Sequence, residues 1–496
     1  MRSAIEREVK LEAPDGFVLP DLSGTVDGVL ARVANERDLD ATYYDTPDLR
    51  LARWGVSVRH RSGDGTGWTV KLPEGDAGPA LVRRELLFDG AAGAIPPGVS
   101  ELLRAYVRSS QLSPAARVRS RRVSVELVDA EGERLAEVVD DDVQTEVGPG
   151  VRRFRELEVE VDERADPGLL EALVAALLTA GAVAVAEPVP KVVRALGAAA
   201  QAPPELVPPR LGPKSTAADV VRAALIGSAV RILQHDPGVR IGDDPEDVHQ
   251  ARVRARRLRS DLRTFRSLLV DSWREPLEAE LRWLGQELGA VRDADVLLER
   301  LRRDAASLPE RDARAVAALV RQLVRQREAA RASMLVALSS DRYVALLDRL
   351  VEAVVEPQTL PVADKRAGPV LARLVQRPWK RLERAVKGLG DDPPDEDLHQ
   401  VRILAKRCRY AAEAAAGVAG KPAARLGKAV ADLQGVLGDH QDAVVAEGWL
   451  RANSRTAALV AGELIAVQRL QAGACRAAWP AAWKRASRKR LRKWMR

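Results

Sequence analysis

The first 200 residues alternate between hydrophobic and polar positions, whereas the rest of the chain repeats its hydrophobic positions every three to four residues. Alternation with period two predicts β-strands, and the longer period predicts amphipathic helices. Many short strands in series are typical of an antiparallel barrel or sandwich. One helix is expected near the end of this part, over 166–180. The expected strands cover residues 5–11, 55–61, 67–72, 82–88, 117–128, 135–139 and 154–161.

A proline-rich stretch separates the two patterns. Residues 201–214, QAPPELVPPRLGPK, contain five prolines and are predicted to form a stiff linker. Helical periodicity then continues to about residue 483, with interruptions near 236–245, 356–365 and 388–394. The predicted fold class is therefore α+β in two modules, with domains at 1–200 and 215–485 and a frayed basic tail at 486–496.

The helical part contains an internal repeat with an offset of 150 residues. HQARVRARRLR at 249–259 returns as HQVRILAKRCR at 399–409, and each copy follows a Pro- and Asp-rich start that supplies helix-capping acids. A Leu-Gly pair with a later Asp follows each copy, at Leu288-Gly289 with Asp293 and at Leu437-Gly438 with Asp442. We interpret the repeat as two similar helical bundles, at about 215–355 and 365–485.

Composition excludes several classes of protein. The 496 residues are 46% hydrophobic and 30% charged, which is typical of a folded chain of several domains. Cys408 and Cys475 are too few for a disulfide framework or a cysteine-based zinc site. The N-terminus lacks an apolar signal core, and the longest apolar stretch, 172–186, is too short to cross a bilayer. We expect a soluble cytoplasmic protein with no membrane partner.

The two halves differ in charge. Residues 1–200 contain 25 Lys and Arg against 34 Asp and Glu, a net charge of −9, whereas 201–496 contain 53 against 37, a net charge of +16. Only 4% of the residues are aromatic, so stacking on unpaired bases is a poor explanation of the basic half. We expect a partner that is recognised through its phosphates, and no specific nucleic acid.

Charged residues of one sign occupy the same face of several predicted strands. A single charged strand face usually lies in water, but a solvated surface normally mixes both signs. If these faces lined a closed barrel, Arg and Lys could bind an anion with many oxygens, and the carboxylates could hold a hard divalent cation. That combination is typical of a nucleotide or triphosphate site. The faces comprise Glu6, Glu8 and Lys10; Arg59 and Arg61; Lys71; Arg117, Arg119 and Arg121; and Glu156, Glu158 and Glu160.

The order of these motifs resembles the CYTH family of triphosphate tunnel metalloenzymes. The resemblance covers about residues 1–200 and implies an eight-stranded antiparallel tunnel that hydrolyses tripolyphosphate or a related triphosphate with Mg²⁺ or Mn²⁺. The middle acidic strand departs from the family's R-x-E-x-E, because Leu87 replaces its second acid. The matching segments are EREVK at 6–10, YYDTPDLRL at 43–51, VSVRHR at 56–61, TVKLP at 69–73, RSRR at 119–122, ELEVEV at 156–161 and PKVVRAL at 190–196.

The resemblance also implies roles for individual residues. Lys10 and Glu85 would be catalytic, the first at the leaving group and the second at the attacking water. A bulge at Arg119 would bring Ser120 and Arg122 into the lumen in its place. The metal would be held by Glu6, Glu8, Glu156 and Glu158. The phosphates would be bound by Arg59, Arg61, Lys71, Arg119, Arg121, Lys191 and Arg194.

Each repeated helix has a basic stripe beside its hydrophobic stripe. A basic stripe on one helix usually faces water, and a lone histidine is usually a capping or core-edge residue. Like charges at i,i+4 destabilise a helix, however, so two copies without acids favour an anionic partner. The repeats resemble the CHAD domain, which implies two four-helix bundles with a surface for inorganic polyphosphate. The stripes comprise His249, Arg252, Arg256, Arg259, His399, Arg402, Lys406 and Arg409.

The sequence therefore predicts a metal-dependent inorganic triphosphatase joined to a polyphosphate-binding module, with tripolyphosphate and polyphosphate as partners. Two alternatives stay open. The same tunnel could run another triphosphate reaction, that of an adenylyl cyclase or a thiamine triphosphatase, with Tyr43, Trp54 or Trp68 recognising a base. The chain could also be a non-catalytic polyphosphate scaffold, which Leu87 favours.

Overall fold

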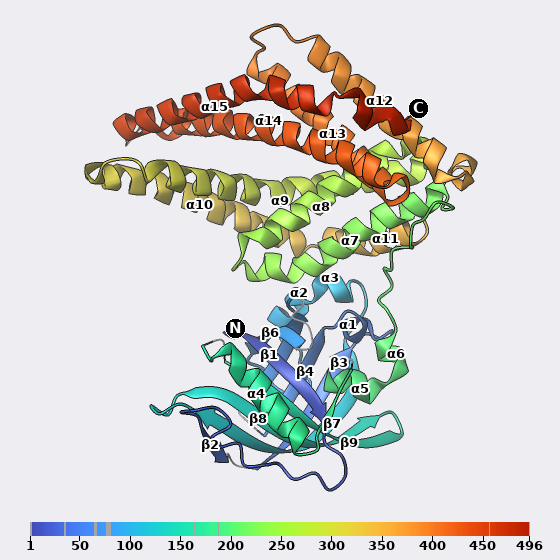
Figure 1. Cartoon of the computed structure of the whole chain (residues 1–496), viewed down its shortest axis with the longest axis vertical. Coiled ribbons are helices and arrows are strands. Elements are labelled where there is room, and N and C mark those ends of the chain that lie inside the picture. Colours follow the sequence, from blue (N-terminus) through green and yellow to red (C-terminus); the bar gives the residue numbers. More distant parts are fainter. Residues whose placement is uncertain are drawn as a thin grey trace. The chain divides into compact units, whose positions relative to one another are not determined.

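The chain forms two compact units, Met1–Pro204 and Glu205–Arg496 (Figure 1). They are seen in a computed structural model that describes residues 2–33, 36–63, 67–75, 81–162, 164–186, 188–455 and 457–495. The first unit is built on one antiparallel sheet and the second is helical. Whether 201–214 acts as a stiff linker stays a prediction. None of the described helices is long and apolar enough to cross a membrane.

The N-terminal unit is a closed barrel of eight antiparallel strands, which confirms the predicted fold. Closure depends on β1 (Arg2–Glu12), whose first half pairs with β6 and whose second half pairs with β9. Two short strands, β2 (Leu30–Val33) and β10 (Val183–Ala184), pair with β7 and β1 at the margin. The barrel runs β1, β6 (Leu81–Phe88), β5 (Gly67–Pro73), β4 (Ser57–Ser62), β3 (Arg37–Asp45), β7 (Ser113–Val128), β8 (Arg134–Val147) and β9 (Gly150–Val161).

The hydrophobic face of the strands points away from the lumen and is covered from outside. Helix α4 (Pro167–Thr179) begins at Asp166, whose carboxylate accepts the Gly168 N–H at 2.7 Å. Its Leu169, Leu173 and Leu177 pack on Leu157 and Val159 of β9, and all are buried. Burial of each such leucine contributes about 2 kcal/mol. The unit also contains the short helices α1 (Arg50–Arg53), α2 (Pro97–Leu102), α3 (Arg104–Val107) and α6 (Ala198–Gln201), whereas α5 (Lys191–Leu196) contributes Lys191 and Val192 to the lumen.

The predicted strands and the helix at 166–180 are present, but two features of the barrel were missed. Strand β3 was not predicted, and β8 has 14 residues where only 135–139 were expected. Three consecutive acids, Asp140 to Asp142, hide the alternation in β8. Of the three, only the Asp141 side chain points into the barrel, and it is completely buried.

The C-terminal unit repeats one helical arrangement. Consecutive helices pack on one another from α7 to α10 and again from α12 to α15. The far ends of both repeats share one core, in which Leu301 and Leu323 meet Leu450 and Leu464. The helices are α7 (Ala217–Ile241), α8 (Pro245–Thr264), α9 (Asp271–Ala305), α10 (Ala313–Leu338), α11 (Asp341–Val355), α12 (Ala367–Lys387), α13 (Asp395–Ala419), α14 (Lys421–Asn453) and α15 (Ala458–Ala486).

Helix α7 extends into the interruption predicted at 236–245. It continues past Pro237 and ends at Gly242, whose φ of 80° suits glycine. The Asp236 carboxylate accepts hydrogen bonds from Arg240 at 2.7 Å and from the Tyr343 hydroxyl of α11 at 2.6 Å. These contacts hold the last turn of the helix.

The expectation of a frayed basic tail is wrong. The 3-10 helix η4 (Lys489–Met495) packs on α12 and α14, and Met495 is buried. Trp379 stacks on Trp483 with the ring centroids 5.4 Å apart, and the Arg492 guanidinium lies 4.5 Å from the Trp379 ring. The basic side chains of the tail thus cover aromatic surface, which composition alone did not indicate.

We predict that Arg492→Ala lowers the free energy of unfolding of the helical unit by about 1 kcal/mol, because it removes a cation–π contact and hydrogen bonds to Ser487 and Glu383. Arg490→Ala, at an exposed neighbour, should change it by less than about 0.5 kcal/mol. Chemical denaturation of the full chain measures both. Equal stabilities of the two variants would contradict the packed tail.

Candidate functional site

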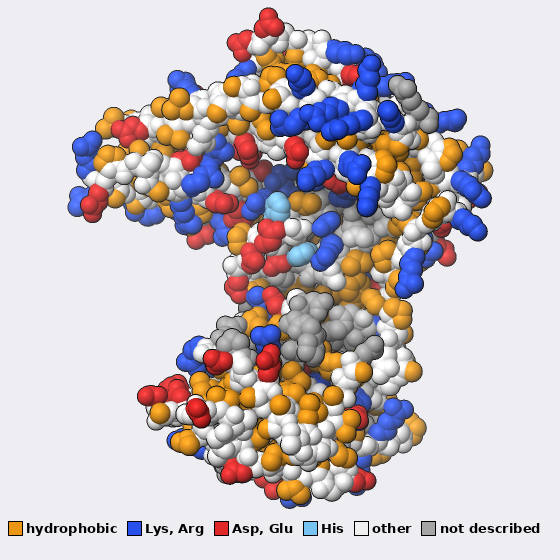
Figure 2. Space-filling model, in the orientation of Figure 1, with side chains coloured by type: hydrophobic (Ala, Val, Ile, Leu, Met, Phe, Trp, Pro, Cys, Tyr) orange, Lys and Arg blue, Asp and Glu red, His pale blue; other side chains and the backbone are white. Residues whose placement is uncertain are grey.

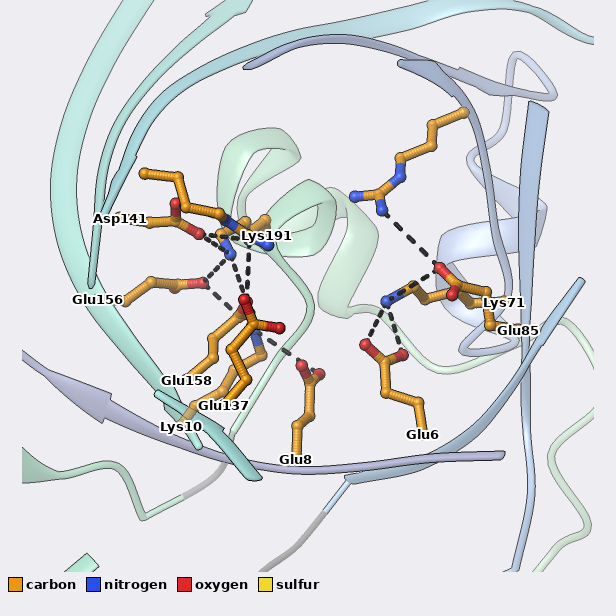
Figure 3. A network of polar contacts seen from close by, with 12 residues as sticks. Glu6, Glu8, Lys10, Lys71, Glu85, Glu137, Asp141, Glu156, Glu158 and Lys191 are labelled. Atoms are coloured by element: carbon orange, nitrogen blue, oxygen red, sulfur yellow. Dashed lines mark hydrogen bonds and ion pairs between the residues drawn. The ribbon is translucent and has the colours of Figure 1, made fainter. Parts of the chain in front are cut away.

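Alternate side chains of the barrel strands point into a common lumen (Figure 3). They line a pocket of about 260 Å³ whose walls are mostly charged. The pocket brings together most of the predicted tunnel residues and several that were not predicted. Its charged lining in the interior comprises Glu6, Lys10, Arg59, Arg61, Lys71, Arg83, Glu85, Arg122, Glu137, Glu158, Glu160 and Lys191.

Three carboxylates form an acid cluster in this lumen. Oxygen atoms of Glu6 and Glu8 on β1 and of Glu160 on β9 all lie within 4.8 Å of one another. Burial alone would raise the pKa of Glu6, but the positive charges of Lys71 and Arg83 lower it to about 2. Burial and the negative charge of Glu6 raise the pKa of Glu160 to about 8. The three carboxylates supply the oxygen ligands that a hard divalent cation prefers, and a bound cation would favour the ionised form of Glu160.

A second group of charges in the lumen is neutralised internally. Lys10 Nζ lies 3.2 Å from Glu156 and also contacts Glu158, and Lys191 Nζ lies 2.6 Å from Asp141 and 2.8 Å from Glu158. Burial would lower the pKa of Lys191, but Glu158 and Asp141 raise it, and the cations hold the pKa of Glu158 well below its usual range. Arg122 adds a third cation, 2.7 Å from Asp141. Three acids thus meet these three cations, and Arg194 at the margin of the lumen lies 3.6 Å from Glu156.

This arrangement brings only part of the predicted metal set together, and the metal ligands stay a prediction. Glu6 and Glu8 lie together as expected, but Glu156 and Glu158 are engaged by Lys10 and Lys191 and lie outside the acid cluster. Glu160 takes the third place. It lies two residues beyond Glu158 on the same strand face, so the alternation of β9 carried the signal for it.

Cations face the acid cluster across the lumen. Lys71 Nζ lies 2.6 Å from Glu6 and 3.6 Å from Glu85, and Arg83 contacts Glu8. Arg59 donates to the Tyr43 hydroxyl at 3.2 Å and lies 3.9 Å from Glu85. The Nε atoms of Arg59 and Arg83 are buried, and neither has an acceptor among the described residues. Unsatisfied guanidinium N–H groups beside an acid cluster fit an anion that binds together with a metal.

The placement of Arg119 and Arg121 in the lumen is wrong. Their side chains are 45% and 66% exposed and pair with Asp40, Glu146 and Glu36 on the outer surface. Val118, Ser120 and Arg122 occupy the inward phase of β7. Both phases of this strand contain arginine, so charge could not identify the inner one. The register shift of β7 lies opposite Tyr43 and Tyr44 and not at Arg119.

The remaining predicted residues lie at different depths. Lys191 is in the lumen, but Arg194 lies at its margin, 3.0 Å from Glu12 and stacked on Phe154. Leu87 is 42% exposed and does not line the pocket. Arg83 was missed as a lumen residue, although it lies two residues before Glu85. The predicted roles of Lys10, Glu85 and the phosphate-binding cations stay predictions.

In the helical unit, the two basic stripes converge where α8 and α13 meet. Burial, together with the positive charges of Arg256, Arg402 and Arg252, lowers the pKa of Lys406 to about 6. Of the predicted histidines, His399 Nδ1 lies 2.7 Å from Gln441 Oε1, and burial lowers the pKa of His249. Lys and Arg side chains gather over this unit in Figure 2.

The repeated Leu-Gly pairs position an arginine in each stripe. A Cβ added to Gly289 would lie 3.6 Å from Arg252 Nε, and one added to Gly438 would lie 3.8 Å from Arg402 Nε. Glycine therefore lets each guanidinium lie against the following helix. Arg252 also pairs with Asp293 at 2.8 Å. The Nε atoms of both arginines are buried without an acceptor in the described part of the chain.

Comparison with known proteins agrees with this division. A model of the CYTH domain matches residues 4–180 and a model of the CHAD domain matches residues 223–451. An uncharacterized protein of Mycobacterium tuberculosis is 35% identical over 492 residues, covering 92% of this chain and 90% of that protein.

Several solved structures are also similar. PptA from Streptomyces chartreusis is 30% identical over 54% of this chain and 100% of its own, with a TM-score of 0.46. The CHAD domain from Ricinus communis is 30% identical over 59% of this chain and 96% of its own, with a TM-score of 0.42. A putative adenylyl cyclase from Hippeastrum is described as having a dominant triphosphatase activity. It is 18% identical over 37% of this chain and 92% of its own, with a TM-score of 0.23.

We predict that Glu160→Gln weakens binding of Mn²⁺ to the full chain about tenfold or more, because an amide replaces one of the three carboxylate ligands of the acid cluster. Glu131→Gln, at an exposed position in the β7–β8 turn, is the matched control and should bind Mn²⁺ like the unmodified protein. Electron paramagnetic resonance of free Mn²⁺ measures both affinities. Unchanged affinity in Glu160→Gln would remove this residue from the metal site.

Proposed function

This chain belongs to the CYTH family over its first unit and to the CHAD family over its second, and on that premise we propose that it is a metal-dependent inorganic triphosphatase with a polyphosphate-binding module. CYTH domains form a family of triphosphate tunnel metalloenzymes, which implies a divalent metal. We propose Mg²⁺ or Mn²⁺ for this chain and tripolyphosphate as the substrate.

The observation that carries the proposal is the acid cluster of Glu6, Glu8 and Glu160 beside Lys71, Arg59 and Arg83. The carboxylates would hold the metal, which when bound neutralises phosphate charge and orients the transferring group. The guanidinium and ammonium groups would bind the phosphate oxygens and stabilise the charge that develops in phosphoryl transfer. Glu85 lies within 4 Å of both Lys71 and Arg59, where it could position the attacking water.

The pocket lining favours an inorganic substrate over a nucleotide or thiamine compound. Tyr43 is the one aromatic residue among the described residues that line it, and its hydroxyl is engaged by Arg59. Trp54 and Trp68 are buried outside the lumen, Trp54 against Tyr106 and Trp68 against Tyr44 and His60. They are therefore poor candidates for a base-recognising surface, which counts against the cyclase and thiamine triphosphatase alternatives.

The argument for a non-catalytic scaffold rested on Leu87. Since this side chain does not line the pocket, its substitution removes no ligand from the acid cluster. Glu160 supplies a third carboxylate from β9 instead. The lumen therefore supports a catalytic function better than a purely binding one.

For the helical unit we propose binding of inorganic polyphosphate by the converged stripes. Arg252, Arg256, Arg402 and Lys406 raise one another's positive potential, as the lowered pKa of Lys406 indicates. A polymer with one negative charge per phosphate would relieve that repulsion. A flexible anion of this kind offers no bases or fixed groove, so charge density alone would select it.

We predict that Arg59→Gln lowers the rate of phosphate release from tripolyphosphate by about 10²–10³-fold, because it removes a cation from the lumen. Arg119→Gln is the matched control on the same barrel and should keep most of the activity, since this side chain is on the outer surface. The assay compares tripolyphosphate, ATP and thiamine triphosphate with Mg²⁺ or Mn²⁺. Faster release from ATP or thiamine triphosphate would refute the substrate, and equal losses in the two variants would refute the lumen assignment.

We also predict that glutamine at Arg252, Arg256, Arg402 and Lys406 weakens polyphosphate binding and lowers its dependence on the logarithm of salt concentration by about three. The matched control replaces the same number of basic residues, the exposed Arg311, Arg314, Arg321 and Arg325 of the same unit. Fluorescence anisotropy of labelled polyphosphate gives both slopes. Equal effects of the two quadruple variants would show that only overall charge matters.

A further inference from the structure

A second basic pocket lies in the helical unit, where the end of α8 and the start of α9 meet α12 and α13. Its volume is about 420 Å³, which is within the usual range for small-molecule sites. Its residues are separate from the predicted polyphosphate-binding set. Leu374, Pro378 and Leu404 form its apolar part. Its principal charged residues are Arg263, Arg266, Arg377, Arg381, Arg407 and Glu278.

Most of these arginines lack a counter-charge within the described protein. The one acid of the pocket lining, Glu278, contacts Arg274 and lies 3.3 Å from Arg263. No described carboxylate forms an ion pair with Arg266, Arg377, Arg381 or Arg407. Burial and the positive charges of Arg263 and Arg381 lower the pKa of Arg407, so these three guanidinium groups repel one another.

The internal repeat provides a comparison within the same molecule. At the offset of 150 residues, Arg407 corresponds to Arg257, and Arg257 is neutralised. Its Nε lies 3.0 Å from Asp261, and its Nη1 contacts Glu413 of α13. The matching positions beside Arg407 are Ala411 in place of Asp261 and Arg263 in place of Glu413. At equivalent places, Arg257 is neutralised by an ion-pair network, whereas Arg407 lies in a cluster of arginines.

We propose that this arginine pocket is a second anion-binding site, which takes a compact anion carrying several phosphate groups. Guanidinium groups bind phosphate oxygens in bidentate fashion, and several on one wall suit a ligand with many oxygens. The apolar part of the lining lowers the polarity around the guanidinium groups, which strengthens such contacts. The pocket lining contains no aromatic residue, so a nucleobase would find no stacking partner.

This site stands independently of the proposed tunnel activity and of the stripes. Its ligand chemistry could come from two sources, a free short oligophosphate or the end of a long polyphosphate chain. Both present closely spaced phosphate groups. The two sources can be distinguished with a long polymer. If the site binds chain ends, protection of its arginines from chemical modification should increase with the concentration of chain ends.

Arginine modification of the full chain tests the site directly. Phenylglyoxal is applied in EDTA with or without tripolyphosphate, and the modified residues are identified by mass spectrometry. At about ten times its dissociation constant, tripolyphosphate should slow modification of Arg377, Arg381 and Arg407 about tenfold by mass action. Exposed Arg314, Arg321 and Arg325 should react at an unchanged rate. A second arm uses long-chain polyphosphate at matched concentrations of chain ends and separates the two sources.

Glutamine variants give a second readout on the same question. The Arg377, Arg381 and Arg407 triple variant should bind one tripolyphosphate fewer per chain in calorimetry than the Arg314, Arg321 and Arg325 triple variant. It should keep the phosphate-release rate of the tunnel. The absence of protection at the three pocket arginines in the unmodified chain, or equal stoichiometry in the two variants, would overturn the site. Absence of phosphate release by the unmodified chain would bear on the proposed function and not on this pocket.

Discussion

The barrel depends on one electrostatic constraint: ionised groups inside a closed lumen must find opposite charge there, because water cannot screen them fully. The structure meets this constraint in two ways. Lys10, Lys191 and Arg122 neutralise Glu156, Glu158 and Asp141, which makes one wall electrostatically complete. On the other wall, oxygen atoms of Glu6, Glu8 and Glu160 lie within 4.8 Å of one another, and the buried Nε atoms of Arg59 and Arg83 meet no acceptor among the described residues. We propose that the first wall is structural and that the acid cluster with its neighbouring arginines binds a metal and an anion.

Alternation predicted a series of antiparallel strands in a barrel or a sandwich, and the resemblance to the CYTH family predicted that eight strands close into a tunnel. Where both faces of a strand carry charged residues, alternation could not show which face points into the lumen. In β7, arginines occupy both phases, so Arg119 and Arg121 were placed inside although Arg122 is the lumen residue. In β9, the face that carries the carboxylates was identified from the sequence. Tertiary packing decides which of these acids contact a cation from α5, and the sequence could not show it. Lys191 forms ion pairs with Glu156 and Glu158, whereas Glu160 lies beside Glu6 and Glu8 of β1.

The helical unit shows how a duplicated framework keeps one feature and loses another. Gly289 and Gly438 hold Arg252 and Arg402 in the same way in both repeats, so the sequence repeat predicted a shared geometry. The ion pairs of Arg257, in contrast, have no counterpart at Arg407. Convergence of the stripes depends on how α8 packs on α13, and packing of the tail depends on the contact between Trp379 and Arg492. Both features arise from contacts between helices, so the pattern of a single helix could not predict them.

The central claim is that the acid cluster binds the divalent metal while the neighbouring group of three acids and three cations does not. A crystal structure of the full chain grown with Mn²⁺ and tripolyphosphate would test it through the anomalous signal of manganese. We predict a peak among the carboxylates of Glu6, Glu8 and Glu160, with phosphate oxygens facing Lys71 and Arg59. A peak at Glu156 and Glu158 with Lys10 and Lys191 displaced, or no peak in the lumen at saturating Mn²⁺, would contradict it.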